Sequence, residues 1–179
     1  MAAENQDAPP ETHTDLRGDR DLTAAAVTIG RPAEELYSHF RDFANLPSFM
    51  ENIVRIDVYD DRRSHWVIKA PAGKTVEWDA TVTAEEQGKW LTWQSDEGAD
   101  IPNSGKVTFV DAGPRGTVVT ATIAYDPPGG VMGKVVAKLF QREPAIQVRR
   151  DLRRFKQLME TGEIATAART RAAREEEMA

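Results

Sequence analysis

The stretch RRSHWVIKAPAGKTVEWDA, residues 62–80, decides the fold of this chain. Apolar and polar side chains alternate on both sides of the Pro-Ala-Gly segment at 71–73, which is typical of two half-buried strands joined by a tight turn. A three-residue turn places Trp66 opposite Trp78, so that both tryptophans share one face and the charged side chains share the other. A turn of even length would mix the two groups. The stretch therefore predicts an antiparallel hairpin with one apolar face.

The same alternation continues beyond this hairpin. Together with the hairpin it predicts about six strands joined by Gly-rich and Pro-rich turns, so most neighbours should pair as antiparallel hairpins. The further period-two segments are 54–58, 91–93, 107–109 and 119–125. The apolar run 24–29 predicts one more strand at the start of the domain, which makes about seven strands in all.

Helical patterns flank the strands. RPAEELYSHFRDF begins with Pro32 and two glutamates, which is a helix start, and Asp42 can cap a second short helix. Apolar residues recur every three or four positions from Met132 to Met159, but Pro144 should kink or divide that long helix. Because one apolar face of a curved antiparallel sheet needs a cover, we assign this role to the C-terminal helix.

The composition of the chain limits the classes of function that it can have. The chain has 179 residues, no cysteine and a net charge of −6, which disfavours DNA binding, thiol chemistry and anionic membrane surfaces. Residues 1–22 and 161–179 are polar and predict flexible tails around a folded domain at 23–160. No apolar segment is long enough for a transmembrane helix or a signal peptide, so a cytoplasmic location is the default expectation.

Residues 128–135 come close to the phosphate-loop pattern G-x-x-x-x-G-K-[ST]. Pro128 stands where the first glycine is needed, and Val135 stands where Ser or Thr would hold magnesium. Proline has no N–H group for a phosphate, and valine cannot bind a metal. The segment therefore predicts a turn into the C-terminal helix and not a nucleotide site.

The apolar face of the sheet is the candidate binding site. If the next hairpin pairs Val82 near Lys89, Trp78 faces Trp93, and three tryptophans form a row across neighbouring strands. Such a row is often simple core packing, but large flat side chains on a concave sheet also line apolar ligand cavities. The predicted lining residues are Trp66, Trp78, Trp93, Phe109 and Tyr125.

Signs of catalysis are weaker. The three histidines are scattered without metal-ligand spacing, and no G-x-S-x-G motif is present. His65 and Asp79 can pair, but on the outer face, where a surface ion pair is the simpler interpretation. A catalyst would need an inward carboxylate, and the sequence identifies none.

Four arginines are spaced to lie together as a ridge on the last helix: Arg149, Arg150, Arg153 and Arg154. This arginine ridge either balances the acidic sheet or docks an acidic protein or RNA.

Three segments carry a family resemblance: RPAEELYSHFRDFANLPSFM (31–50), the hairpin at 62–80 and DLRRFKQLMETGE (151–163). Together they resemble the START-related helix-grip (SRPBCC) superfamily, and within it the bacterial polyketide cyclase/dehydrase and coenzyme Q-binding START-like subfamily. The resemblance implies an α+β fold in which a curved antiparallel sheet wraps around a long C-terminal helix and leaves a cavity between them. It implies a small apolar ligand such as a lipid, quinone, isoprenoid or polyketide.

Three hypotheses follow for the function. The first is a non-catalytic binder of a small apolar ligand, with no cofactor and no metal. The second is a cyclase or dehydratase acting on a polyketide-like substrate. The third is a protein-interaction or ribosome-interaction module that uses the arginine ridge.

Overall fold

The computed structural model describes residues 21–126 and 144–164. Its centre is a single antiparallel sheet of seven strands in the order β1-β7-β6-β5-β4-β3-β2. The strands are β1 (Asp21–Ile29), β2 (Ile53–Val58), β3 (Arg63–Lys69), β4 (Thr75–Glu86), β5 (Trp90–Ser95), β6 (Asn103–Asp111) and β7 (Thr117–Tyr125). The helices are α1 (Ala33–Arg41) and α3 (Pro144–Thr161), with short 3-10 turns η1 (Phe43–Ser48), η2 (Pro71–Gly73) and η3 (Gly113–Arg115). The predicted α+β class and its strand number are confirmed.

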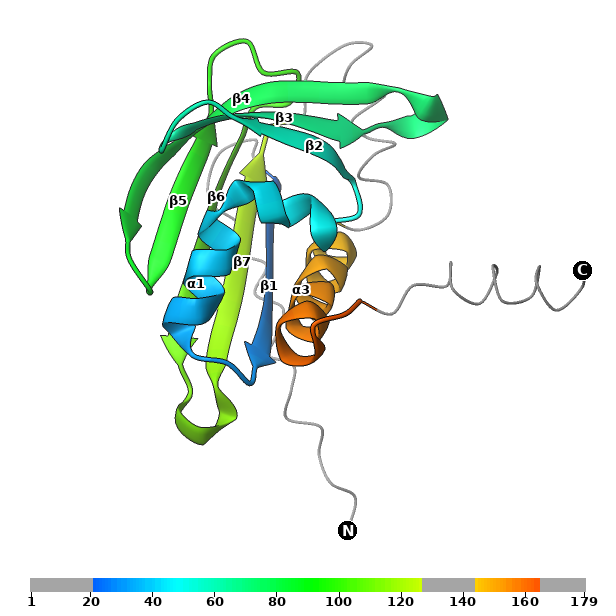
Figure 1. Ribbon diagram of the computed structural model, residues 1–179. Helices are drawn as coiled ribbons and strands as arrows, with labels where there is room; N and C mark the ends of the chain where they lie inside the picture. Colours follow the sequence, from blue (N-terminus) through cyan, green and yellow to red (C-terminus); the bar gives the residue numbers. More distant parts are fainter. Residues whose placement is uncertain (1–20, 127–143, 165–179) are drawn as a thin grey trace, which may run out of the picture.

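The sheet is strongly curved, and the helices lie on its concave side (Figure 1). The sequence predicts that the C-terminal helix alone covers this face, whereas the structure divides the cover among three elements: α3 packs against β1, α1 against β6, and η1 against β2. Phe155 of α3 stacks on Phe49 with ring centroids 4.7 Å apart, and Phe40 of α1 meets both rings at about 6 Å. These aromatic contacts join the three covering elements into one core.

The first helix and the turn after it form as the sequence predicts. Glu34 and Glu35 lie in the first turn of α1, where they complement the helix dipole, and the buried side chains lie on one stripe. Asp42 follows α1, and its side chain accepts a hydrogen bond of 3.3 Å from the backbone N–H of Ala44. The predicted cap of the second short helix is therefore present.

The register of the β3–β4 hairpin is also confirmed. Trp66 lies opposite Trp78, and His65 lies opposite Asp79. The turn is the predicted three-residue segment, and Ala72 and Gly73 within it both adopt positive φ angles, of 60° and 71°. Glycine adopts such angles at little cost, so it suits the end of this turn.

The register predicted for the next hairpin is wrong. Strand β4 does not turn after Val82 but continues to Glu86, and Glu86 pairs with Trp90. A β-bulge between Val82 and Ala84 leaves Thr83 as the extra residue, so Trp93 lies opposite Val82 and not opposite Trp78. The two positions are four residues apart along β4, roughly 13 Å at the rise of a strand. The three tryptophans do not form a straight row.

The C-terminal helix is held at its far end by the β1–α1 connection. Glu160 accepts a 2.6 Å hydrogen bond from the backbone N–H of Gly30, and Arg31 donates from Nε to the carbonyl of Met159 at 2.9 Å. Gly162 follows the helix with a φ angle of 77° and donates to the carbonyl of Leu158, which is the predicted stop. The described part of α3 begins at Pro144. The helical pattern upstream of Pro144 and the turn predicted at 127–130 lie outside the described residues.

Candidate functional site

Trp66 and Trp78 face the concave side of the sheet as a cross-strand pair. The indole N–H of Trp66 donates to the buried hydroxyl of Ser64 at 2.9 Å, and its ring meets Phe43 of η1 edge-on at 5.7 Å. Trp78 belongs to a second, smaller cluster with Val76 and Tyr125. Both tryptophans are only partly buried, although they lie on the inner face. The inner face therefore presents aromatic surface that the described part of the chain does not fully cover.

Trp93 lies flat across strand β6. Its register partner is Gly105, and a Cβ atom built on that glycine would lie 2.1 Å from the indole ring. No side chain other than hydrogen fits beneath the ring, so the glycine is what lets the tryptophan lie against the sheet. Trp93 lies on the inner face, as the sequence predicts, but alternation alone does not identify the glycine that accommodates it.

Phe109 and Tyr125 lie in different surroundings. Phe109 is 3% exposed and packs edge-on against Tyr37 and Phe40 of α1, at 5.7 and 6.0 Å. Tyr125 ends β7 and borders an open hollow. The sheet thus brings Trp78 and Tyr125 into one cluster and places Trp66, Trp93 and Phe109 in or against the other. That all five line a ligand cavity stays a prediction.

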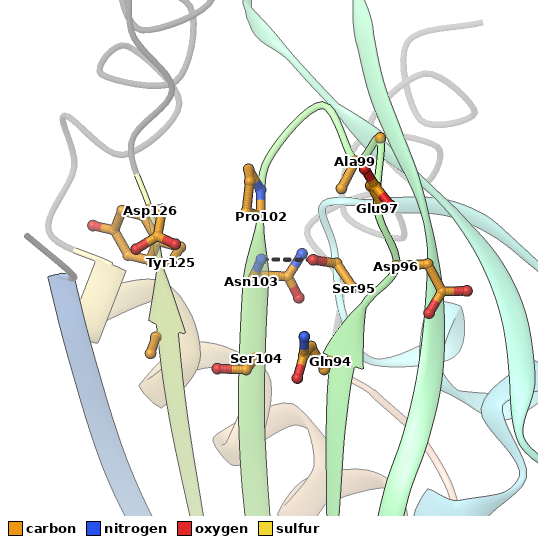
Figure 2. Close-up of a pocket in the computed structure, with 12 residues that line it drawn as sticks. Gln94, Ser95, Asp96, Glu97, Ala99, Pro102, Asn103, Ser104, Tyr125 and Asp126 are labelled. Atoms are coloured by element: carbon orange, nitrogen blue, oxygen red, sulfur yellow. Dashed lines mark hydrogen bonds between the residues drawn. The ribbon is translucent and has the colours of Figure 1, made fainter.

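The hollow at Tyr125 has a volume of about 350 Å³ and lies where β5 and β6 separate beyond the pair Gln94–Ser104 (Figure 2). The hydroxyl of Ser95 accepts from the backbone N–H of Asn103 at 2.9 Å across the gap. Twelve residues line it: Gln94, Ser95, Asp96, Glu97, Gly98, Ala99, Pro102, Asn103, Ser104, Ala124, Tyr125 and Asp126. Three of them are carboxylates and none is Lys or Arg, so the lining itself carries only negative formal charge. Arg63, outside the lining, makes an ion pair of 3.6 Å with Asp96 and offsets part of this charge.

An inward carboxylate that the sequence analysis missed is Glu85. The bulge at Thr83 reverses which side chains of β4 face inward, and it turns Glu85 toward α1. Its carboxylate accepts from the Tyr37 hydroxyl at 2.7 Å and from Arg41 Nε at 2.5 Å. The Arg41 hydrogen bond lowers the pKa of Glu85, and burial together with the nearby Glu85 raises the pKa of Tyr37 to about 12. This group joins a helix to the sheet, and both carboxylate oxygens of Glu85 are engaged in it.

Asp151, on α3, is a second inward carboxylate that the sequence analysis missed. Burial raises its pKa to about 7, against smaller opposing effects from a hydrogen bond with Gln147 (3.0 Å), the backbone of Glu51 and the charge of Arg154. It lies one helical turn before Phe155, beside the core. At neutral pH this carboxyl group therefore exists in both protonation states and can donate or accept a proton. Its only signal in the sequence was its place near the apolar stripe of the helix.

The two histidines that the structure describes, His39 and His65, do not belong to a cluster placed to hold a metal. The Nδ1 atom of His65 lies 2.8 Å from Asp79 on the outer face, and Nε2 lies 3.6 Å from Glu77, which matches the predicted surface pair. The ring of His39 stacks near Phe155 at 5.9 Å. Within residues 21–126 and 144–164, no group of three or more His, Asp and Glu side chains is placed to hold a metal. In the same part of the chain, no helix is long and apolar enough to cross a membrane.

The arginine ridge is not uniform. Arg150 and Arg153 are exposed, whereas Arg154 makes a 3.3 Å ion pair with Glu51 and Arg149 is partly covered. The ridge therefore presents two arginines to solvent, and its role in docking a protein or RNA stays a prediction.

A curved antiparallel sheet that wraps around a C-terminal helix, with an aromatic inner face, defines the helix-grip (SRPBCC) class of proteins. The family described as polyketide cyclase/dehydrase and lipid transport matches residues 29–153, and the chain belongs to this family. None of the curated proteins compared matches the chain.

Several solved structures are similar. A Deinococcus radiodurans protein has 43% sequence identity and a TM-score of 0.66, over 80% of this chain and 99% of its own. A Thermus thermophilus protein has 23% identity and a TM-score of 0.63, over 76% of this chain and 95% of its own. An aromatase/cyclase from a Streptomyces species has 10% identity and a TM-score of 0.63, over 82% of this chain and 99% of its own. The last two show the fold alone.

Proposed function

We propose that this protein binds a small hydrophobic ligand, such as a lipid, quinone, isoprenoid or polyketide-like molecule, on the concave face of its sheet. The observation that carries the proposal is the incomplete burial of Trp66, Trp78 and Trp93, which all face inward. In an ordinary core such large side chains would be covered, because each buries much apolar area. The family, which includes lipid transport, and the aromatase/cyclase fold of a distant neighbour support the same class of ligand.

The energetics favour an apolar molecule at these side chains. Removing apolar surface from water contributes about 25 cal/mol per Å², before the costs of association. Indole rings add flat surfaces on which a planar ligand can stack. A molecule that covers the tryptophans would therefore complete the burial that the sheet and helices begin.

The test of this site compares two tryptophans of one sheet. Trp78→Ala removes inner-face aromatic surface and should weaken binding of a decylquinone or a similar apolar probe by about tenfold or more. Trp90→Ala is the matched control, because Trp90 lies on the outer face under Lys106 and should leave binding unchanged. Calorimetric titration measures the affinity, and urea denaturation checks both folds. If the Trp78 variant loses stability but keeps its affinity, the tryptophan is core and the ligand site lies elsewhere.

Native mass spectrometry of the protein purified from its own host, followed by solvent extraction, would identify a bound molecule. A lipid, quinone or polyketide recovered in this way supports the proposal directly. A protein that carries no ligand and binds none of these classes in titration would contradict it.

A second function, a polyketide-type cyclase or dehydratase, is favoured by Asp151. Aldol cyclisation and loss of water both need a group that exchanges protons near neutral pH, and burial gives Asp151 this property. Mass spectrometry of a poly-β-ketone substrate incubated with the protein tests this function, through a cyclised product or a mass loss of one water. Binding of the substrate without either change would favour the non-catalytic function.

A further inference from the structure

Strand β2 is an edge strand of the sheet, at the end opposite β1. Among the described residues, only β3 pairs with it. The edge carries exposed apolar side chains, with Val54 45% exposed and Val58 52% exposed. An exposed edge of this kind is a template for pairing with another strand unless the sequence opposes it.

The backbone of β2 can accept such a partner at alternate residues only. Tyr59 donates its N–H to Arg63 across the β2–β3 hairpin, so residues of the same parity, 57 and 55, also hydrogen-bond toward β3. The N–H and C=O groups of Ile56 and Val58 then point to the open side. A second antiparallel strand must therefore bond to β2 through these even-numbered positions.

This restriction leaves few registers for a second copy of β2, and charge selects among them. If Ile56 of one copy lies opposite Ile56 of the other, Arg55 lies opposite Asp57 of the second copy, and this occurs twice by symmetry. Moving the register by two residues in one direction places Arg55 opposite Arg55, and in the other direction it places Asp57 opposite Asp57. Like charges directly opposite are destabilising and opposite charges are stabilising, so one register is favoured.

The favoured register also places the exposed apolar side chains of the two copies opposite each other. Val54, the bulged residue at the end of the paired segment, comes opposite Val58 of the second copy, so this register brings the two exposed valines together. Arg55 and Asp57 are 59% and 49% exposed and form an ion pair of 2.9 Å within one chain, so both lie on the same face and can exchange this pair for one with a second copy. The bulge between Ile53 and Arg55 ends the paired segment at its N-terminal side.

We propose that β2 is a self-complementary interface through which two copies of this chain pair edge to edge about a two-fold axis at Ile56. The occupant is a second copy because the strand is its own complement in charge and in apolar pattern. The pairing joins the two sheets into one, and the axis stands perpendicular to the sheet at the contact. The concave faces then remain open to ligands.

Charge reversal of full-length chains tests this pairing. Sedimentation velocity over a range from low micromolar to near-millimolar concentration should show a monomer–dimer equilibrium for the wild type. Asp57→Arg and Arg55→Asp should each weaken dimerisation at least tenfold, because each places like charges opposite one another twice. A mixture of the two variants should form a heterodimer, because every Arg of one chain then faces an Asp of the other.

Each chain keeps its own substitution in the mixture. Recovery of dimerisation on mixing would therefore show that the substitutions act on pairing and not on folding. The double variant Arg55→Asp/Asp57→Arg should regain the affinity of the wild type. Glu97→Arg, an equal change of net charge on the β5–β6 loop, is the control and should not weaken the dimer. A wild type that stays monomeric at every concentration, or a dimer that Asp57→Arg does not weaken, would overturn the proposal.

Discussion

Burial and hydrogen bonding act in opposite directions on the pKa of the Asp151 carboxyl group. Its hydrogen bonds with Gln147 and the backbone of Glu51 favour the charged form, but burial outweighs them and raises the pKa from 3.8 to about 7. Because the folded pKa exceeds the unfolded one, the contribution of this group to stability is fully present only at low pH, below the unfolded pKa. That contribution is lost as the pH rises through the folded pKa, near 7.

The variant Asp151→Asn should remove this pH dependence. At pH 8 it should unfold with a free energy on the order of 2 kcal/mol greater than the wild type, because no charge is buried. At pH 4 the two proteins should be nearly equal. Urea denaturation at the two pH values measures the difference. A gap of the same size at both values would mean that the carboxyl group is not titrating in the folded protein.

At the scale of elements, the bulge in β4 determines how α1 attaches to the sheet. One extra residue at Thr83 turns Glu85 inward, where Tyr37 and Arg41 of α1 both donate to it. The side chains of Arg41 and Glu85 remain 24% and 30% exposed, so solvent weakens the ion pair. The hydrogen bonds of the Tyr37 hydroxyl and the guanidinium are therefore the larger contribution.

We predict that Glu85→Ala lowers the free energy of unfolding by about 1–2 kcal/mol near neutral pH. The lowered pKa of Glu85 means that its contribution is present above the ordinary carboxyl pKa and is lost as the pH falls. Chemical denaturation of Glu85→Ala, Arg41→Ala and the double variant should give non-additive losses. Glu86→Ala is the control, since this exposed neighbour bonds to Lys89 and Trp90 near the β4–β5 turn. Strictly additive losses would show that Arg41 and Glu85 do not act together.

At the scale of the whole molecule, the acidic hollow beside Tyr125 adds charge selectivity to the proposed apolar site. Asp96, Glu97 and Asp126 line it without any Lys or Arg, and the net charge of the chain is −6. Arg63 offsets part of this charge through its ion pair with Asp96, and the carboxylates that remain should repel an anionic ligand while leaving a neutral one unaffected.

A fatty alcohol should accordingly bind more tightly than the fatty acid of equal chain length, by about three- to tenfold at low salt. The gap should narrow as salt screens the carboxylates, and it should narrow in the double variant Asp96→Asn/Glu97→Gln. Competition against a fluorescent apolar probe measures both affinities. Equal affinities would remove the charge selectivity but keep the apolar site, whereas no binding of either molecule would contradict the site itself.

Local patterns in the sequence determined much of this architecture. The β3–β4 register, the Asp42 cap and the stop at Gly162 depend on residues within a few positions of one another, so alternation, capping and turn chemistry suffice to predict them. The strand number and the antiparallel class followed because each half-buried strand carries its own period-two pattern.

Only the tertiary structure decided the β4–β5 register, the division of the cover among α1, η1 and α3, and the inward positions of Glu85 and Asp151. A bulge moves every later side chain to the other face, and nothing in the letters around Thr83 fixes where the extra residue lies. Whether a carboxylate is buried depends on elements distant in sequence, since Glu85 meets α1 and Asp151 meets the segment after η1. Local periodicity carries no information on such contacts between distant elements, because they form only when the sheet curves around its helices.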